Sequence, residues 1–192
     1  MEFIRDFFRA ISPLSDQSWE EIKPLFKYRK LAAQEYFVEE HSYAQELAFL
    51  GKGCVRAFFT NASGKEYNKQ FFVGPSLIGA YTSLLTGEKN LIPQQALTEC
   101  DIWAAEYKEL AKLFDRFHDL ERIARKIAEY YFLEKERKEL EMALKDATQR
   151  YAIFQAQFPG LEQEIPQYHI ASYLSIAPTQ LSRIRASLSK GN

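Results

Sequence analysis

The side chains best suited to binding chemistry gather near the C-terminus, where hydrogen-bonding and cationic residues occupy positions 178–185. No aspartate or glutamate occurs from Ile165 onward, in a chain whose formal net charge is only −1. The same segment contains the cations Arg183, Arg185 and Lys190. Arginine and lysine bind phosphates and release counterions from nucleic acid. This local basic charge therefore predicts a partner that carries phosphates.

Two short helices joined by a tight turn must position these residues. Pro166 and Pro178 each suit the first turn of a helix, because the fixed φ and missing N–H of proline cost nothing there. Residues 175–177 lie between the two helices and are expected to form the turn. Apolar residues recur at helical spacing in both helices, namely Ile170, Ala171 and Leu174 in the first and Leu181, Ile184 and Leu188 in the second. The pattern predicts a helix-turn-helix, and the alternative is an ordinary helical hairpin that closes a core.

The second helix of a DNA-bound helix-turn-helix enters the major groove and reads base edges. We expect Arg183 to contact a guanine edge and Arg185 to contact a phosphate. The complete set of expected DNA contacts is Gln167, Tyr168, His169, Pro178, Thr179, Gln180, Ser182, Arg183 and Arg185.

The stretch that reads IASYLSIAPTQLSRIRASL resembles the DNA-binding motif of the Crp/Fnr family of bacterial transcription regulators, and Arg183 matches the arginine with which that motif ends. Pro178 and Thr179 stand where the best-known members carry an arginine and a glutamate that read bases, so an operator sequence does not carry over. The resemblance implies a double-stranded DNA operator, a homodimer, RNA polymerase as a further partner and a cytoplasmic location. Few residues follow the second helix, so we expect the β-hairpin wing of relatives to be absent or much reduced.

Residues 27–105 contain short runs of β-branched and aromatic residues between glycine-containing turns, which is typical of an all-β unit. The segment ELAFLGKGCVRAFFTNASGKEYNKQFFVGPSLIGAY resembles the cyclic-nucleotide-binding β-roll. We therefore expect an α+β fold with an N-terminal antiparallel β-roll sensor domain, similar to a double-stranded β-helix or jelly roll. A long dimerisation helix and a C-terminal helix-turn-helix domain follow. The expected boundaries of the three parts are 1–116, 117–146 and 147–192.

The ligand cassette of this β-roll departs from the family pattern. Members that bind cyclic nucleotides place a glutamate on the ribose and an Arg-Ser pair on the cyclic phosphate, whereas Ala80 and Asn90–Leu91 stand at these positions here. A buried phosphate without its arginine loses roughly 1.5–3 kcal/mol. Cyclic AMP is therefore not expected as the effector, whose identity stays open, and no cofactor is predicted. The expected effector pocket consists of Gly79, Ala80, Tyr81, Lys89, Asn90, Leu91 and Lys135.

Residues 117–146 contain neither proline nor glycine and predict a single helix of roughly 40 Å. An apolar stripe at three- and four-residue spacing suggests that this helix packs against a copy of itself. The expected dimer seam is Leu120, Ala124, Ile127 and Tyr131. The alternative is an amphipathic helix that lies on its own β-roll.

Other classes of function find little support in the sequence. The histidines His41, His118 and His169 lie in different predicted elements, and no Gly-rich phosphate loop or nucleophile motif occurs, so an enzyme is not expected. Cys54 and Cys100 are too few for a metal finger or an iron–sulfur cluster. The N-terminal segment has no continuous apolar run, so neither export nor membrane association is expected. The open alternative is a ligand-sensing or protein-interaction module of the same fold that no longer binds DNA.

Overall fold

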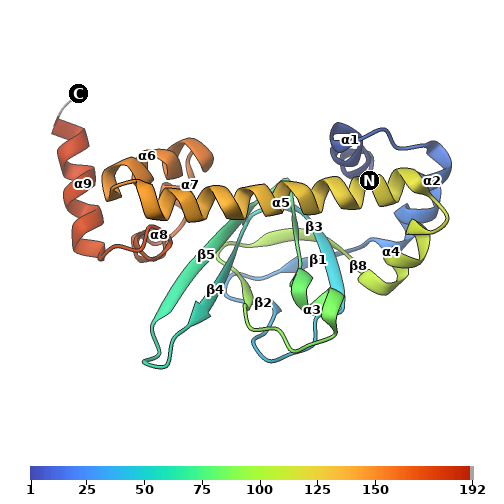
Figure 1. The fold of residues 1–192 in the computed structure, drawn as a ribbon, viewed down its shortest axis with the longest axis horizontal. Coiled ribbons are helices and arrows are strands. Elements are labelled where there is room, and N and C mark those ends of the chain that lie inside the picture. Colours follow the sequence, from blue (N-terminus) through green and yellow to red (C-terminus); the bar gives the residue numbers. More distant parts are fainter. Residues whose placement is uncertain (191–192) are drawn as a thin grey trace.

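The computed structural model describes residues 1–190, with side chains through Leu188. At its centre lie two four-stranded antiparallel sheets (Figure 1). The first contains, in spatial order, β1 (Lys27–Leu31), β8 (Cys100–Glu106), β3 (Glu46–Lys52) and β6 (Ser76–Ile78). The second contains β2 (Tyr36–Val38), β7 (Gln94–Ala96), β4 (Cys54–Thr60) and β5 (Glu66–Val73). Apolar side chains from both sheets are buried together between them, so the expected antiparallel β-roll is present.

A glycine at the junction of β3 and β4 sets the direction of β4. Gly53 has φ of 97°, a conformation that favours glycine, and a Cβ there would lie 2.6 Å from the carbonyl oxygen of Glu99. Successive side chains of a strand point to opposite faces. Accordingly, Val55 packs inside the roll, whereas Cys54 and Arg56 face the C-terminal helices.

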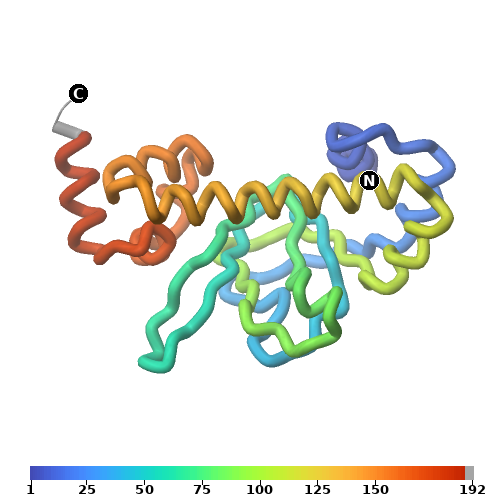
Figure 2. The backbone as a smooth tube through the Cα atoms, viewed as in Figure 1, coloured from blue at the N-terminus to red at the C-terminus, as the bar shows by residue number. Residues whose placement is uncertain are grey.

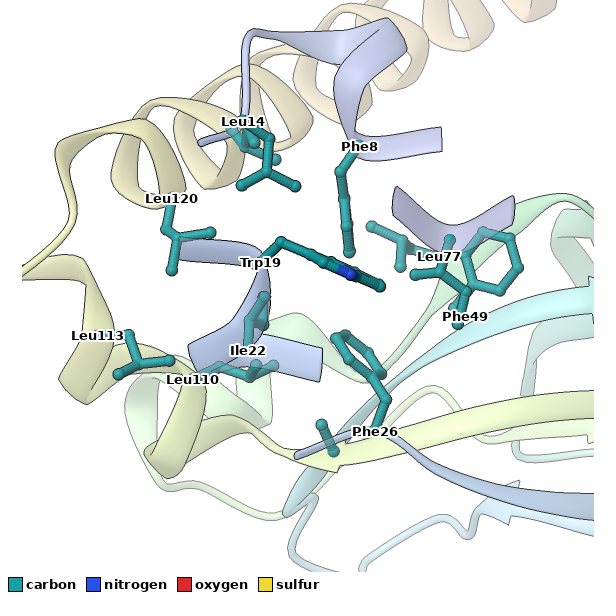
Figure 3. Close-up of a cluster of buried hydrophobic side chains, with 13 residues drawn as sticks. Phe8, Leu14, Trp19, Ile22, Phe26, Phe49, Leu77, Leu110, Leu113 and Leu120 are labelled. Carbon is teal, nitrogen blue, oxygen red and sulfur yellow. The ribbon is translucent and has the colours of Figure 1, made fainter. Parts of the chain in front are cut away.

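Short helices close the end of the β-roll nearest the N-terminus. They are α1 (Glu2–Ile11), α2 (Asp16–Ile22), the 3-10 helix η1 (Lys23–Leu25) and α4 (Tyr107–Phe114), while α3 (Tyr81–Thr86) lies between β6 and β7. Trp19 is fully buried among side chains from these helices and from the first sheet (Figure 3). Asp119 accepts hydrogen bonds from the Ser18 hydroxyl at 2.6 Å and from the Ser15 N–H at 2.9 Å. These bonds attach the N-terminal helices to the start of the long helix.

The long helix α5 (His118–Leu144) runs along the whole molecule, above the sheets (Figures 1 and 2). The stripe expected to be a dimer seam instead faces the protein's own fold. Leu120 is 3% exposed, and Ile127 packs against the same cluster as Trp19. The Tyr131 hydroxyl donates to the Leu77 carbonyl at 3.0 Å. The assignment of Leu120, Ile127 and Tyr131 to a dimer seam is therefore wrong, because the β-roll and N-terminal helices already cover them, while Ala124 is half-buried. Within residues 1–190, no helix is long and apolar enough to span a bilayer.

Four helices form the C-terminal part at the far end of α5 (Figure 1). They are α6 (Ala147–Gln157), α7 (Leu161–Glu164), α8 (Gln167–Tyr173) and α9 (Pro178–Lys190). Asp146 caps α6, since its side chain accepts the Gln149 N–H at 2.9 Å while Gln149 reaches back to the Asp146 N–H. The predicted helix-turn-helix is confirmed as α8, a turn and α9.

Candidate nucleic-acid interface

The polar face of α9 is exposed from Pro178 to Arg185. Leu181 is 1% exposed and anchors the helix in the apolar core of the C-terminal part. Ile184 is half-buried, but Leu188 is 43% exposed, so the buried stripe is shorter than expected. The predicted contact residues on this helix that are exposed are Pro178, Thr179, Gln180, Ser182, Arg183 and Arg185.

The turn before α9 holds the two helices close together. Ser175 has φ of 54°, and its N–H donates to the Ser172 carbonyl at 3.1 Å. The Ile176 N–H donates to the Ala171 carbonyl at 3.0 Å. Ala171 is fully buried, and its small side chain permits the close crossing that the motif needs. The turn therefore fixes the direction in which α9 leaves the core.

The two arginines of α9 have different surroundings. Arg183 is exposed, and no hydrogen bond or ion pair engages it among residues 1–188. The Nε of Arg185 lies 4.0 Å from a carboxylate oxygen of Glu162, which also accepts the Tyr151 hydroxyl at 2.6 Å. Arg183 is thus the freer of the two to contact a partner, while Arg185 stays near the body of the protein.

The three predicted contacts on α8 differ in their exposure to solvent. Tyr168 is 56% exposed. Gln167 is half-buried and donates through its amide to the Glu162 carbonyl at 2.9 Å. His169 is only 2% exposed and faces the second sheet. The expected phosphate contact of His169 is therefore wrong for this conformation, because α8 buries the imidazole against the second sheet.

His169 belongs to a group of polar residues between the β-roll and the helix-turn-helix, which we name the junction cluster: Arg56, Glu66, Asn68 and His169. Arg56 Nη1 donates to Glu66 at 2.5 Å and lies 3.5 Å from His169 Nδ1. The Asn68 amide donates to the His169 carbonyl at 2.9 Å and lies 3.2 Å from His169 Nδ1. Arg56 is 4% exposed and also donates twice to Gln95. Sequence patterns alone do not reveal this cluster, although an arginine inside the apolar strand CVRAFF needs buried partners.

A hydroxyl on α8 satisfies the free edge of β5, the last strand of the second sheet. The Asn68 N–H donates to Ser172 Oγ at 3.0 Å, and Ser172 donates to the Glu66 carbonyl at 3.1 Å. An unpaired strand edge is otherwise a site of aberrant pairing. These two bonds join the helix-turn-helix to the sheet with a defined register.

An aromatic core spans the same boundary. Phe71 of β5 is 1% exposed, and its ring centroid lies 5.0 Å from that of Tyr173, 5.9 Å from Phe158 and 6.3 Å from Phe154. Lys138 of α5 lies over the Tyr173 ring, with Nζ 3.4 Å from the centroid. Burial lowers the pKa of Lys138 to about 8, which Glu141 partly opposes. The β-roll and the helix-turn-helix therefore share one core.

The expected effector pocket is mostly a structural loop. Asn90 is 5% exposed, and its amide donates to the carbonyls of Glu39 at 3.1 Å and Ile92 at 3.0 Å. The Gln94 amide donates to the Gly79 carbonyl at 3.0 Å. Around them, Ala80 is buried, Tyr81, Lys89 and Leu91 are exposed, and Lys135 pairs with Glu139 on α5. Asn90 is therefore occupied in holding the loop.

Two cavities lie away from these cassette residues. One of about 420 Å³ separates the junction cluster from the start of α9 and is lined by Lys65, Tyr168 and Pro178 among others. Another of about 450 Å³ is an apolar groove between β5 and α5, lined by Val73, Tyr130 and others. Among residues 1–188, no group of histidines, cysteines and acids is placed to hold a metal ion.

The outer face of α5 carries an apolar surface that the protein itself leaves uncovered, which we name the dimer surface. It comprises Phe132, Leu133, Leu140 and Leu144, which are 66%, 56%, 55% and 73% exposed. Leu133, Leu140 and Leu144 follow one another at spacings of seven and four residues, as in the seam of a coiled coil.

Comparison with solved structures identifies the fold. FixK2 from Bradyrhizobium japonicum has a TM-score of 0.78 and 16% identity, with 86% of this chain and 85% of that chain covered. The c-di-GMP responsive global regulator CLP from Xanthomonas campestris has a TM-score of 0.70 and 16% identity, over 92% of this chain and 93% of that chain. A transcriptional regulator assigned to the crp/fnr family, from Eubacterium rectale, has a TM-score of 0.72 and 12% identity, over 93% and 85%. No protein-family model and no curated protein matches the sequence. The chain therefore has the fold of Crp/Fnr transcription regulators.

Proposed function

We propose that this chain is a sequence-specific DNA-binding transcription regulator of Crp/Fnr type that acts as a homodimer in the cytoplasm. One observation carries the proposal: α9 presents an exposed face without acids, on which Arg183 is free of partners among the described residues. Leu181 of α9 and Ala171 of α8 are buried and fix the position of α9 in the helix-turn-helix. In this proposal residues 1–116 sense a signal, 117–146 dimerise and 147–192 bind DNA, with RNA polymerase as a further partner.

The dimer surface supports two-fold binding to DNA. Leu133, Leu140 and Leu144 form an exposed stripe that a second copy of α5 can cover. A dimer that reads a palindrome places its two recognition helices in successive major grooves, about 34 Å apart. Arg183 then contacts a guanine edge, Thr179 and Gln180 contact neighbouring bases, and Arg185, Gln167 and Tyr168 contact phosphates.

Substitution of the two arginines on α9 tests this assignment. Arg183→Ala is expected to weaken operator binding by roughly 1–3 kcal/mol and to relax preference at one base pair in each half-site, because a bidentate base contact is lost. Arg185→Ala is its matched control on the same helix. It should weaken binding evenly over all sequences and reduce the slope of log affinity against log salt by about one.

The experiment starts with selection of sites from random duplexes by the wild-type protein. Both variants are then titrated on the selected site and on a scrambled duplex at several salt concentrations. If no site is enriched, or if Arg183→Ala keeps both the affinity and the preference of the wild type, the DNA-reading role is wrong. The ligand-sensing or protein-interaction module of the same fold is then the better explanation.

The effector proposed for this regulator is not cyclic AMP. Ala80 offers no carboxylate for a ribose, and the buried Asn90 is already bonded to Glu39 and Ile92. We expect calorimetric titration with cyclic AMP or cyclic GMP to give a dissociation constant weaker than about 10 μM, which corresponds to roughly −7 kcal/mol. Tighter binding would contradict this, and a Lys89→Ala variant would then show whether the exposed Lys89 replaces the family's arginine.

A further inference from the structure

The protonation state of His169 follows from its hydrogen bonds. Its Nδ1 faces two donors, the Asn68 amide at 3.2 Å and Arg56 Nη1 at 3.5 Å, so Nδ1 is the acceptor. The proton of the neutral imidazole is then on Nε2. This Nε2 is buried and has no hydrogen-bond partner. His169 therefore fits the junction cluster in one neutral tautomer, at the cost of an unsatisfied N–H.

The charged groups that face His169 disfavour protonation of its neutral imidazole. β4 contributes Arg56 and β5 contributes Glu66, whose carboxylate is already bound to Arg56. Lys65 lines the same cavity, while the other residues of the cluster and the turn are uncharged. Burial, followed by the charge of Arg56, lowers the pKa of His169 to about 4, and Glu66 opposes this shift only partly. A protonated ring would present N–H groups at both nitrogens, so that Nδ1 would point a donor at two donors.

We propose that the junction cluster is a pH-sensitive latch, in which neutral His169 holds α8 against β5 and protonation of His169 releases the helix-turn-helix from the sensor sheet. After release, the imidazole of His169 is hydrated and can carry a proton on each ring nitrogen. The bonds between Ser172 and the edge of β5 and the shared aromatic core open in the same step. The latch concerns how the two parts of the chain are held together, and it does not depend on what α9 binds.

The pH range of the latch follows from linkage. A histidine exposed to water has a pKa of about 6.5. Because the pKa of His169 is lowered in the docked state to about 4, docking is fully favoured above pH 6.5 and weakens as the pH falls toward 4. Between pH 7.5 and pH 5.5 the docking equilibrium should shift about tenfold toward release. Exposed carboxylates stay largely ionised at pH 5.5, so this interval isolates the histidine.

The two native cysteines report on docking without any label. Cys54 is fully buried in the core shared with the helix-turn-helix, and burial raises its pKa, with a smaller contribution from Glu164 of α7. Cys100 is fully buried between the two sheets of the β-roll. Release of the helix-turn-helix uncovers Cys54 and leaves Cys100 covered. Cys100 is therefore an internal control for global unfolding.

The test is pulse labelling of the intact protein with 4,4′-dithiodipyridine, which reacts with thiols in mildly acidic solution, followed by mass spectrometry. Rates are divided by the rate of a small cysteine peptide at the same pH. We expect the Cys54 rate to rise about tenfold from pH 7.5 to pH 5.5 while Cys100 stays protected. In His169→Asn, whose amide oxygen can accept near the position of Nδ1, the rise should disappear. In the control His118→Asn, at a position that is 89% exposed, it should persist.

Three outcomes overturn the latch: a Cys54 rate independent of pH, a rise that survives in His169→Asn, or parallel exposure of Cys100. A measurement on the wild type covers the case in which His169→Asn does not fold. In a titration of the histidine side chains by nuclear magnetic resonance, His169 should titrate near pH 4, well below the ordinary histidine pKa of about 6.5. A midpoint for His169 near that ordinary value equally rejects the proposal.

Discussion

Leu140→Lys is expected to convert the protein from dimer to monomer and to abolish high-affinity operator binding. Leu140 is 55% exposed at the middle of the dimer surface. A two-fold interface contains the residue twice, and each leucine lost from a buried seam removes about 1.5–3 kcal/mol. The dimer dissociation constant should therefore rise by roughly 10²- to 10⁴-fold, which sedimentation equilibrium measures directly. Operator affinity should fall because each half-site is then bound alone.

Leu85→Lys is the matched control for this change. Leu85 is 58% exposed on α3, away from α5, so the variant should keep the dimer. Ile127→Lys separates the two faces of α5, because Ile127 packs on the protein's own core and its replacement should lower stability. A wild type that is monomeric at micromolar concentration, or a dimeric Leu140→Lys variant, would show that another surface makes the dimer.

Phe71→Ala should cause the largest loss of stability, roughly 3–5 kcal/mol, since it empties the centre of a buried aromatic cluster. Its ring packs on Phe154, Phe158 and Tyr173, all of which belong to the C-terminal part. The substitution should therefore also separate unfolding into two steps. Both tryptophans, Trp19 on α2 and Trp103 on β8, lie in the β-roll and its N-terminal helices, so their fluorescence follows that part while circular dichroism follows all helices.

Phe59→Ala provides the comparison, because it removes the same side chain from the adjoining strand β4. Phe59 is 45% exposed and stacks on Tyr67, with ring centroids 5.3 Å apart. Its replacement should change the free energy of unfolding by no more than about 1 kcal/mol and keep the two optical transitions together. Equal losses for the two variants, or coincident transitions in Phe71→Ala, would mean that the shared core does not couple the two parts.

The sequence by itself determined the features that depend on neighbouring residues. Pro178 fixes the start of α9, and the helical spacing of Leu181 and Ile184 fixes which face of α9 is buried. Glycine in a positive-φ turn marks the β3–β4 junction at Gly53. The absence of aspartate and glutamate from the exposed face of α9 could be predicted for the same reason, because helical spacing shows which residues lie on that face. The β-roll and the helix-turn-helix could therefore both be predicted.

Only the tertiary structure decided what covers each apolar or polar face. Helical spacing shows that α5 has apolar stripes, but it cannot tell whether Ile127 and Tyr131 meet a second copy or the β-roll, and they meet the β-roll. In the same way, position on α8 made His169 resemble a phosphate contact, whereas Arg56 and Asn68 enclose it. These hydrogen-bond partners are 54 to 113 residues apart in the sequence, and local periodicity carries no information about such contacts.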